Sequence, residues 1–248
     1  MRAAVISAGT GERLQAEGVR TPKPLVTVLG EPLIARALRA AGGLGAESVA
    51  CIVNDVHPEV ASYLRSRAWP APLRLVVRTT PSSMESLFAL EEHLAGAPFL
   101  LFTVDVVAPK AAIEAFAARA RALPEGCGAL ALTGFVDDEK PLWARVDAGG
   151  RISGLGDAAR GSGLVTAGFY FLPPSVFSFV AEARARGLYT VGFAGYDGGA
   201  FVDNADVDCC FVVRSQSVHR IQEAQALLGY ALWSATHERF GDREVGAV

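Results

Sequence analysis

The chain has 248 residues, of which 51% are hydrophobic and 20% charged, with a formal net charge of −3. This balance predicts a soluble globular protein with an ample core, and it disfavours a nucleic-acid-binding protein, which would carry a basic surplus or stripe. The apolar runs are too short to span a bilayer, and the first residues lack a secretory leader pattern, so we expect a cytoplasmic protein without membrane partners. The cysteines, Cys51, Cys127, Cys209 and Cys210, lack metal-binding spacing and are expected to be buried, reduced thiols.

Short apolar runs alternate with segments of helical periodicity, which is typical of a wound α/β sheet. Because the runs are apolar throughout, we expect a mostly parallel, mixed sheet with helices on both faces. No linker or repeat divides the chain, so we expect a single Rossmann-like wound domain over residues 1–248. The expected strands are 3–6, 49–53, 73–77, 99–104, 129–132, 143–146 and 165–171, and the expected helices are 33–41, 59–67, 83–94, 111–122, 175–186 and 217–236.

The segment after the first strand combines a glycine turn with two isolated cations. The turn is followed by Arg13, and Lys23 stands between two prolines. Such a turn presents backbone N–H groups to an anion, because glycine has no Cβ to block close approach. A Walker A loop needs Gly-Lys-Ser/Thr where Glu12 stands, and a dinucleotide fingerprint needs a third glycine where Leu14 stands. The turn therefore predicts phosphate binding of another kind, and a nicotinamide-dependent oxidoreductase is a weak alternative.

The order of these motifs resembles that of the nucleotidyltransferase superfamily, which includes sugar-phosphate and alcohol-phosphate nucleotidylyltransferases. The family signature, A-A-G-x-G-x-R-(M/L), P-K-x-L and G-x-P-(L/M/I), corresponds to residues 7–14, 22–25 and 30–33. The alternative, a glycine turn with solvated basic residues, leaves this ordered series of matches to chance. The resemblance implies a nucleotide-diphospho-sugar transferase type of fold. It also implies nucleotide binding by the backbone of Ala8, Gly9, Thr10 and Gly11.

The resemblance further implies that the two cations are catalytic. Attack of one phosphate on the α-phosphorus of a nucleoside triphosphate brings negative charges together, and cations at the site must offset that repulsion. By resemblance, Arg13 holds the triphosphate and Lys23 lies beside the α-phosphate. The flanking prolines would stiffen the backbone around Lys23.

Asp105 directly follows the apolar run 99–104. A carboxylate at the C-terminal end of a parallel strand faces the ligand side of such a sheet. The resemblance implies that Asp105 binds Mg²⁺, a hard cation that prefers oxygen ligands. The alternative is a cap of the next helix, although that helical pattern starts only near Lys110.

The second metal ligand of the family has no clear counterpart in this chain. The best register places Arg214 and Gln216 where relatives carry acidic residues, and Asp203, Asp206 and Asp208 lie just upstream. The sequence therefore leaves the second ligand, and with it full catalytic competence, open.

Two further segments correspond to substrate-binding regions of the family. Thr80, Pro81, Ser82 and Ser86 stand where relatives contact the base and ribose, a role compatible with a capped helix start. Lys140 is a candidate for the acceptor phosphate or a solvated hairpin charge, and Gly168 would let the acceptor come close. Residues 141–157 predict a hairpin that turns at Gly149 and Gly150 and serves as a lid or an antiparallel edge.

These features together predict a nucleotidyltransferase. The expected reaction transfers a nucleoside monophosphate from an NTP to a phosphorylated small molecule, such as a sugar or alcohol phosphate, and releases pyrophosphate with Mg²⁺ as cofactor. The alternative is a catalytically impaired homologue that binds nucleotide or sugar phosphate in a regulatory role. Homodimerisation, the nucleobase and the acceptor are left open.

Overall fold

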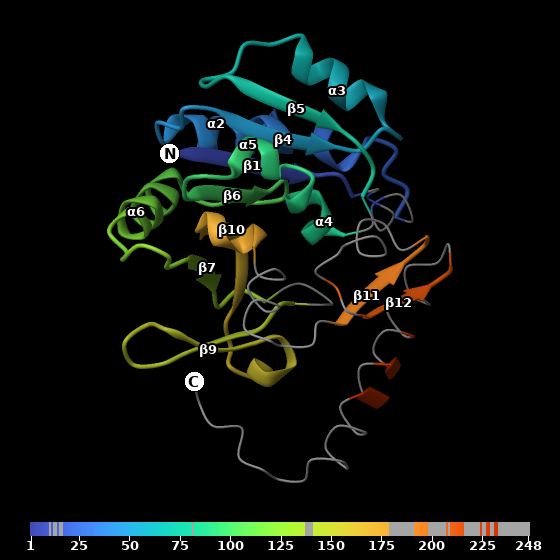
Figure 1. Cartoon of the computed structure of the whole chain (residues 1–248). Coiled ribbons are helices and arrows are strands. Elements are labelled where there is room, and N and C mark those ends of the chain that lie inside the picture. The colour runs from blue at the N-terminus through green and yellow to red at the C-terminus, as the bar shows by residue number, and fades with distance from the viewer. Residues whose placement is uncertain are drawn as a thin grey trace. The chain divides into compact units, whose positions relative to one another are not determined.

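The computed structural model describes residues 1–9, 11, 14, 17–80, 82–136, 141–178, 191–197, 207, 209–215, 224, 227–228 and 231–232. The chain divides into two compact units, Met1–Phe177 and Ser178–Val248, which we describe separately. The first contains the main sheet and its helices, and the second contains a small pair of strands (Figure 1). The expectation of one nucleotidyltransferase domain over the whole chain stays a prediction.

The first unit is built around a six-stranded sheet. In spatial order the strands are β5 (Leu73–Val77), β4 (Val49–Val53), β1 (Arg2–Ser7), β6 (Phe99–Thr103), β10 (Val165–Leu172) and β7 (Ala129–Thr133). β5, β4, β1 and β6 pair in parallel, whereas β10 runs antiparallel to both β6 and β7. The predicted mostly parallel mixed sheet is confirmed.

Helices cover both faces of this sheet. On one face lie α2 (Leu33–Gly43), α3 (Pro58–Arg65) and α6 (Lys110–Arg121), and on the other lie α4 (Ser83–Phe88) and α5 (Glu91–Leu94). Side chains of a strand alternate between faces, and β1 therefore feeds two separate hydrophobic clusters. Val5 packs with residues of α2, α3 and α6, whereas Ile6 packs with Leu87 and Leu94 of α4 and α5.

The prediction of one continuous helix over residues 83–94 is wrong, because α4 ends at Phe88 and α5 begins only at Glu91. Between the two helices the hydrogen bonds span three residues instead of four. The N–H of Leu90 donates to the carbonyl of Leu87, and the N–H of His93 donates to the carbonyl of Leu90, both at 3.0 Å. Leu90 stays fully buried at this break, so the apolar periodicity continues through it. The expected helix at 175–186 starts as a short 3-10 turn, η3 (Pro174–Phe177), and its remainder and most of 217–236 lie outside the described residues.

The predicted hairpin at 141–157 is present as β8 (Ala144–Val146) and β9 (Ile152–Leu155), which pair antiparallel. Its turn includes Gly150, which adopts a φ of 78°. The expectation of an edge strand is wrong, because these two strands form a sheet of their own. A single bridge between Trp143 and Val165 joins the hairpin to β10.

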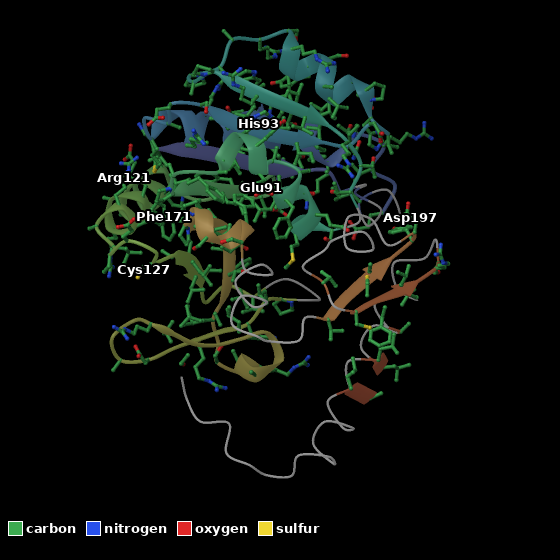
Figure 2. All side chains as sticks on the ribbon, viewed as in Figure 1. Glu91, His93, Arg121, Cys127, Phe171 and Asp197 are labelled. Atoms are coloured by element: carbon green, nitrogen blue, oxygen red, sulfur yellow. The ribbon has the colours of Figure 1, made fainter. Side chains whose placement is uncertain are left out.

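Only one of the cysteines is buried, which corrects the expectation of four buried thiols. Burial raises the pKa of the Cys51 thiol to about 12. Cys127 is exposed because it stands in a glycine-flanked loop before β7, and Figure 2 shows it near the start of that strand. Cys209 and Cys210 are partly exposed in the second unit, where β11 (Val191–Gly195) and β12 (Cys209–Val213) pair in parallel.

Across the part of the chain that the structure describes, every helix is too short or too polar to cross a membrane.

Candidate functional site

Lys23 and Asp105, which are 82 positions apart in the chain, meet at the C-terminal edge of the parallel strands. Asp105 stands two residues after β6, and Lys23 begins the 3-10 turn η1 (Lys23–Leu25). The ammonium Nζ of Lys23 donates to Oδ2 of Asp105 at 2.6 Å. The structure therefore brings the predicted catalytic lysine and the predicted metal ligand into direct contact.

The electrostatic setting keeps Asp105 ionised. Burial raises the pKa of its carboxyl, but the hydrogen bond and charge of Lys23, with a hydrogen bond to Thr103, outweigh this and lower the pKa overall. The side chains of Lys23 and Asp105 are 34% and 52% exposed. An ion pair this accessible stabilises the fold by only about 0–1 kcal/mol, so a phosphate or a metal ion can displace either partner.

The backbone around Lys23 is tightly held. The carbonyl of Pro22 accepts from the N–H of Leu25 at 2.8 Å, and that of Lys23 accepts from Val26 at 3.2 Å. Gly11 of the glycine turn has a φ of 73°, and a Cβ added there would lie 3.4 Å from the Cβ of Lys23. Gly11 therefore packs against the base of the Lys23 side chain.

Gly168 supports Asp105 from the neighbouring strand. The hydroxyl of Thr103 has one proton, which it can donate to the carbonyl of Gly168 at 3.2 Å or to the carboxylate of Asp105. A Cβ added at Gly168 would lie 2.5 Å from Oγ1 of Thr103 and 2.9 Å from Cγ2 of Val106, at a φ of 79°. Packing against Thr103 and Val106 thus explains why a glycine stands at this position, and its contact with the acceptor stays a prediction.

We expect Gly168→Ala to lower the free energy of unfolding by about 2–4 kcal/mol, from the left-handed φ and the displacement of Thr103. The matched control is Gly150→Ala, because Gly150 has a φ of 78° and nothing within 4 Å of an added Cβ. That control should lose only about 1 kcal/mol in urea denaturation. Equal losses in the two variants would show that the contact with Thr103 is unimportant.

Three of the predicted base- and ribose-binding residues, Thr80, Ser82 and Ser86, are hydrogen-bonded at the start of α4. Ser82 is the N-cap, and its Oγ accepts from the N–H of Glu85 at 3.2 Å. The hydroxyls of Thr80 and Ser86 lie 2.5 Å apart, and that of Ser86 donates to the carbonyl of Ser82 at 3.1 Å. This geometry gives the serines a structural role, and their contact with nucleotide stays a prediction.

The remaining predicted site residues differ in what the structure says of them. Ala8 is buried and Gly9 is exposed at the end of β1. Arg214 is exposed directly after β12, in the second unit. Thr10, Arg13, Pro81 and Lys140 lie outside the described residues, as do Asp203, Asp206, Asp208 and Gln216.

Asn54 was missed by sequence reasoning. It directly follows β4, is only 3% exposed, and donates from Nδ2 to the carbonyl of Gly9 at 2.9 Å. Its Oδ1 accepts from the N–H of His57 at 3.1 Å. The side chain thereby ties the glycine turn to the loop after β4. The signal was a polar residue at the end of a fully apolar strand, the same signal that identified Asp105.

Among the residues that the structure describes, Asp105 is the carboxylate that this site offers to a divalent metal. Within the described residues there is no group of three or more His, Cys, Asp or Glu side chains that could hold a metal ion. One carboxylate oxygen, kept ionised by Lys23, suits Mg²⁺ because this ion commonly retains waters and takes its other ligands from substrate phosphates.

The mostly parallel sheet of this order and the Lys–Asp pair beside β6 belong to a domain that a family model identifies as a nucleotidyltransferase. The chain belongs to the family of MobA-like NTP transferase domains, whose model matches residues 3–167. The predicted class and fold are therefore confirmed.

Two curated proteins are similar to parts of the chain. CMP-5′-(3-aminopropyl)phosphonate synthase from Streptomyces rubellomurinus is 33% identical over 121 residues, which are 48% of this chain and 19% of that protein. Phosphoheptose isomerase from Paramagnetospirillum magneticum is 46% identical over 59 residues, 24% of this chain and 30% of that protein. The chain thus spans only a minor part of the length of either relative.

Solved structures share the fold at low sequence identity. The inositol-1-phosphate CTP transferase from T. maritima superposes with a TM-score of 0.60 at 20% identity, over 72% of this chain and 73% of that one. A UDP-glucose pyrophosphorylase in complex with UDP-glucose gives a TM-score of 0.60 at 16% identity, over 73% and 80%. At these identities the likeness concerns the fold alone.

Proposed function

We propose that the chain transfers a nucleoside monophosphate from an NTP to a phosphorylated small molecule and releases pyrophosphate, in a Mg²⁺-dependent reaction. The observation that supports this most is the Lys23–Asp105 pair at 2.6 Å, packed against the glycine turn. A partly exposed cation and an ionised carboxylate stand side by side next to Gly11, and by family resemblance the backbone N–H groups of that turn would receive the triphosphate. We also propose a cytoplasmic location for the protein.

In the proposed reaction an oxygen of the acceptor phosphate attacks the α-phosphorus of the NTP. A new P–O bond forms, the bond from the α-phosphorus to the oxygen bridging to the β-phosphate breaks, and pyrophosphate leaves with that electron pair. Lys23, and Arg13 by family resemblance, offset the charge that gathers on the phosphates. Bound Mg²⁺ would supply further charge neutralisation beside Asp105. No side-chain nucleophile is needed, since catalysis rests on positioning and charge.

The names of the relatives suggest which substrates to test first. One is named for a CMP-linked phosphonate, one for CTP transfer to inositol-1-phosphate, and one for isomerisation of a phosphoheptose. CTP with a phosphonate, an alcohol phosphate or a heptose phosphate is therefore the first set of pairs. The acceptor itself does not follow from the fold, because one scaffold hosts many substrates.

We expect pyrophosphate release with Mg²⁺ for at least one pair in a panel of four NTPs and these acceptors, and none when EDTA removes the metal. The control omits the acceptor, because hydrolysis of NTP alone would also release phosphate products. A rise in melting temperature with NTP, but no pyrophosphate with any acceptor, would favour the regulatory binding protein instead. That alternative is supported by Arg214, which stands where relatives carry an acidic residue.

A further inference from the structure

A groove with a volume of about 390 Å³ lies between α2 and α6, on the face of the sheet opposite to α4 and α5. Phe102 of β6 and Val106 contribute to its lining, together with Ala37 and Ala40 of α2 and Ile113 of α6. Pockets that hold small molecules have volumes of about 300–1,000 Å³. Neither Lys23 nor Asp105 lines this groove, so it is distinct from the candidate catalytic site.

The groove owes its space to short side chains on α2. Ala37, Ala40 and Gly43 line it, and none of them reaches across to α6. The two helices are nevertheless tied together at one end, where Arg121, the last residue of α6 (Figure 2), donates from Nη2 to the carbonyl of Leu44 at 2.5 Å. This hydrogen bond closes the groove at the C-terminal ends of the two helices.

The charged residues of the groove are unevenly balanced. Glu31 is shared by Arg39, whose Nη1 lies 2.7 Å from Oε1, and by Arg36, whose Nη1 lies 3.6 Å from Oε2. Lys110 pairs with Glu114 at 3.5 Å. These lining residues comprise three cations and two carboxylates, which leaves one positive charge without a counter-charge among them.

Arg36 is the lining cation with the longest distance to a carboxylate. Its side chain is 24% exposed, and its Nε is buried without a hydrogen-bond acceptor in the described part of the chain. Its contact with Glu31 at 3.6 Å is too long for a hydrogen bond. A buried donor left unpaired costs about 1–3 kcal/mol, and native proteins normally satisfy such groups with protein, water or a bound ligand.

We propose that the groove is a second ligand site, which binds a small organic anion. The anionic group, a phosphate or a carboxylate, accepts from the guanidinium of Arg36, and an apolar body lies over the partly exposed Ala40, Leu44 and Ala108. This site goes beyond nucleotidyl transfer and does not depend on it.

The groove lies next to Asp105 in the chain and is lined by the helix that follows the turn of Lys23. Val106, which lines the groove, directly follows Asp105. The first residue of α2, Leu33, donates from its N–H to the carbonyl of Val26, directly after the turn that holds Lys23, at 2.9 Å. If binding in the groove alters NTP affinity, NTP alters the affinity of the groove ligand by the same factor.

The proposal is tested by titrating the ¹⁵N-labelled chain with hexyl phosphate, heptanoate and hexanol in separate NMR experiments without nucleotide. We expect saturable shifts of α2 and α6 amides with at least one of the two anions, which also tells a phosphate from a carboxylate site. Hexanol should bind at least about tenfold more weakly, since its neutral hydroxyl can accept a hydrogen bond from Arg36 but forms no ion pair with it. Absence of binding by both anions, or equal binding of hexanol, would overturn the proposal.

Two variants locate the binding. Ala40→Leu fills the groove and keeps its charges, and Arg36→Met removes the guanidinium but keeps an apolar stem; each should weaken anion binding by about tenfold or more. Arg65→Met, an exposed change on α3, is the matched control and should bind normally. Because Arg36→Met removes an unpaired buried donor, its melting temperature should not fall. Undiminished anion affinity in both groove variants would refute the site, whether or not the chain proves to be a transferase.

Discussion

Replacing Lys23 with alanine should lower turnover by about 10²-fold or more while leaving the fold intact. The loss is expected because a preorganised cation beside the reacting phosphates is removed, and such groups contribute about 2.7–4 kcal/mol to the transition state. The fold should survive, because Lys23 is about one-third exposed and its ion pair with Asp105 is worth little. Pyrophosphate release under saturating substrates measures the effect.

The control for this prediction is Arg74→Ala, which removes an exposed cation from β5. It should keep normal turnover and a normal circular dichroism spectrum. If Lys23→Ala unfolds the chain, Lys23 is a scaffold residue, and if it retains full turnover, its catalytic role is wrong.

Asp105→Asn should make nucleotide binding nearly independent of Mg²⁺ and lower turnover by about 10²-fold or more, since metal-based charge stabilisation is worth several kcal/mol. The native carboxylate is held ionised and is the partner of Lys23. The amide is a poorer metal ligand, and it also releases Lys23 from its ion pair. We therefore expect Mg²⁺-NTP affinity to fall, whereas NTP affinity in EDTA stays the same or rises.

Isothermal titration calorimetry with Mg²⁺ and with EDTA measures these two nucleotide affinities separately. Glu125→Gln, which neutralises an exposed carboxylate in the loop after α6, is the charge-matched control and should behave like the native chain. Equal weakening of nucleotide binding in Mg²⁺ and in EDTA would contradict the metal role of Asp105. It would leave a plain electrostatic or structural role in its place.

The sheet could be predicted closely from the sequence because β4 and β6, two of its parallel strands, are apolar on both faces. The bounds of β4 and β5 match the expected ranges, and β1 and β6 differ by a residue at their ends. The break between α4 and α5 could not be predicted, since a tightened turn at Leu90 preserves the buried face that periodicity reports. The pairing of β8 with β9 was predicted as a hairpin, but its separation from the main sheet was hidden, because alternation marks a strand and not the sheet that it joins.

The residues of the candidate site and the edge of the sheet on which they lie could be predicted. The direct contact between them could not. The motifs identified Lys23 and Asp105, and the parallel order implied that they share an edge. The 2.6 Å pair itself joins residues 82 positions apart and depends on how η1 folds back. The groove lined by Arg36 was invisible, because it depends on the space left between two helices rather than on any motif.

The reversed direction of β10 has an evolutionary consequence. β7 ends at Thr133 and β10 begins at Val165, and these two residues pair with each other, so residues 134–164 leave and re-enter the sheet at one point on its C-terminal edge. A segment anchored in this way can lengthen at little entropic cost, about 0.6 kcal/mol per doubling of a flexible loop. We expect insertions in this segment to be tolerated, although it is anchored next to β6, the strand that precedes Asp105. Lineages of this fold can therefore diversify that segment while the parallel strands, and the side chains at their ends, remain unchanged.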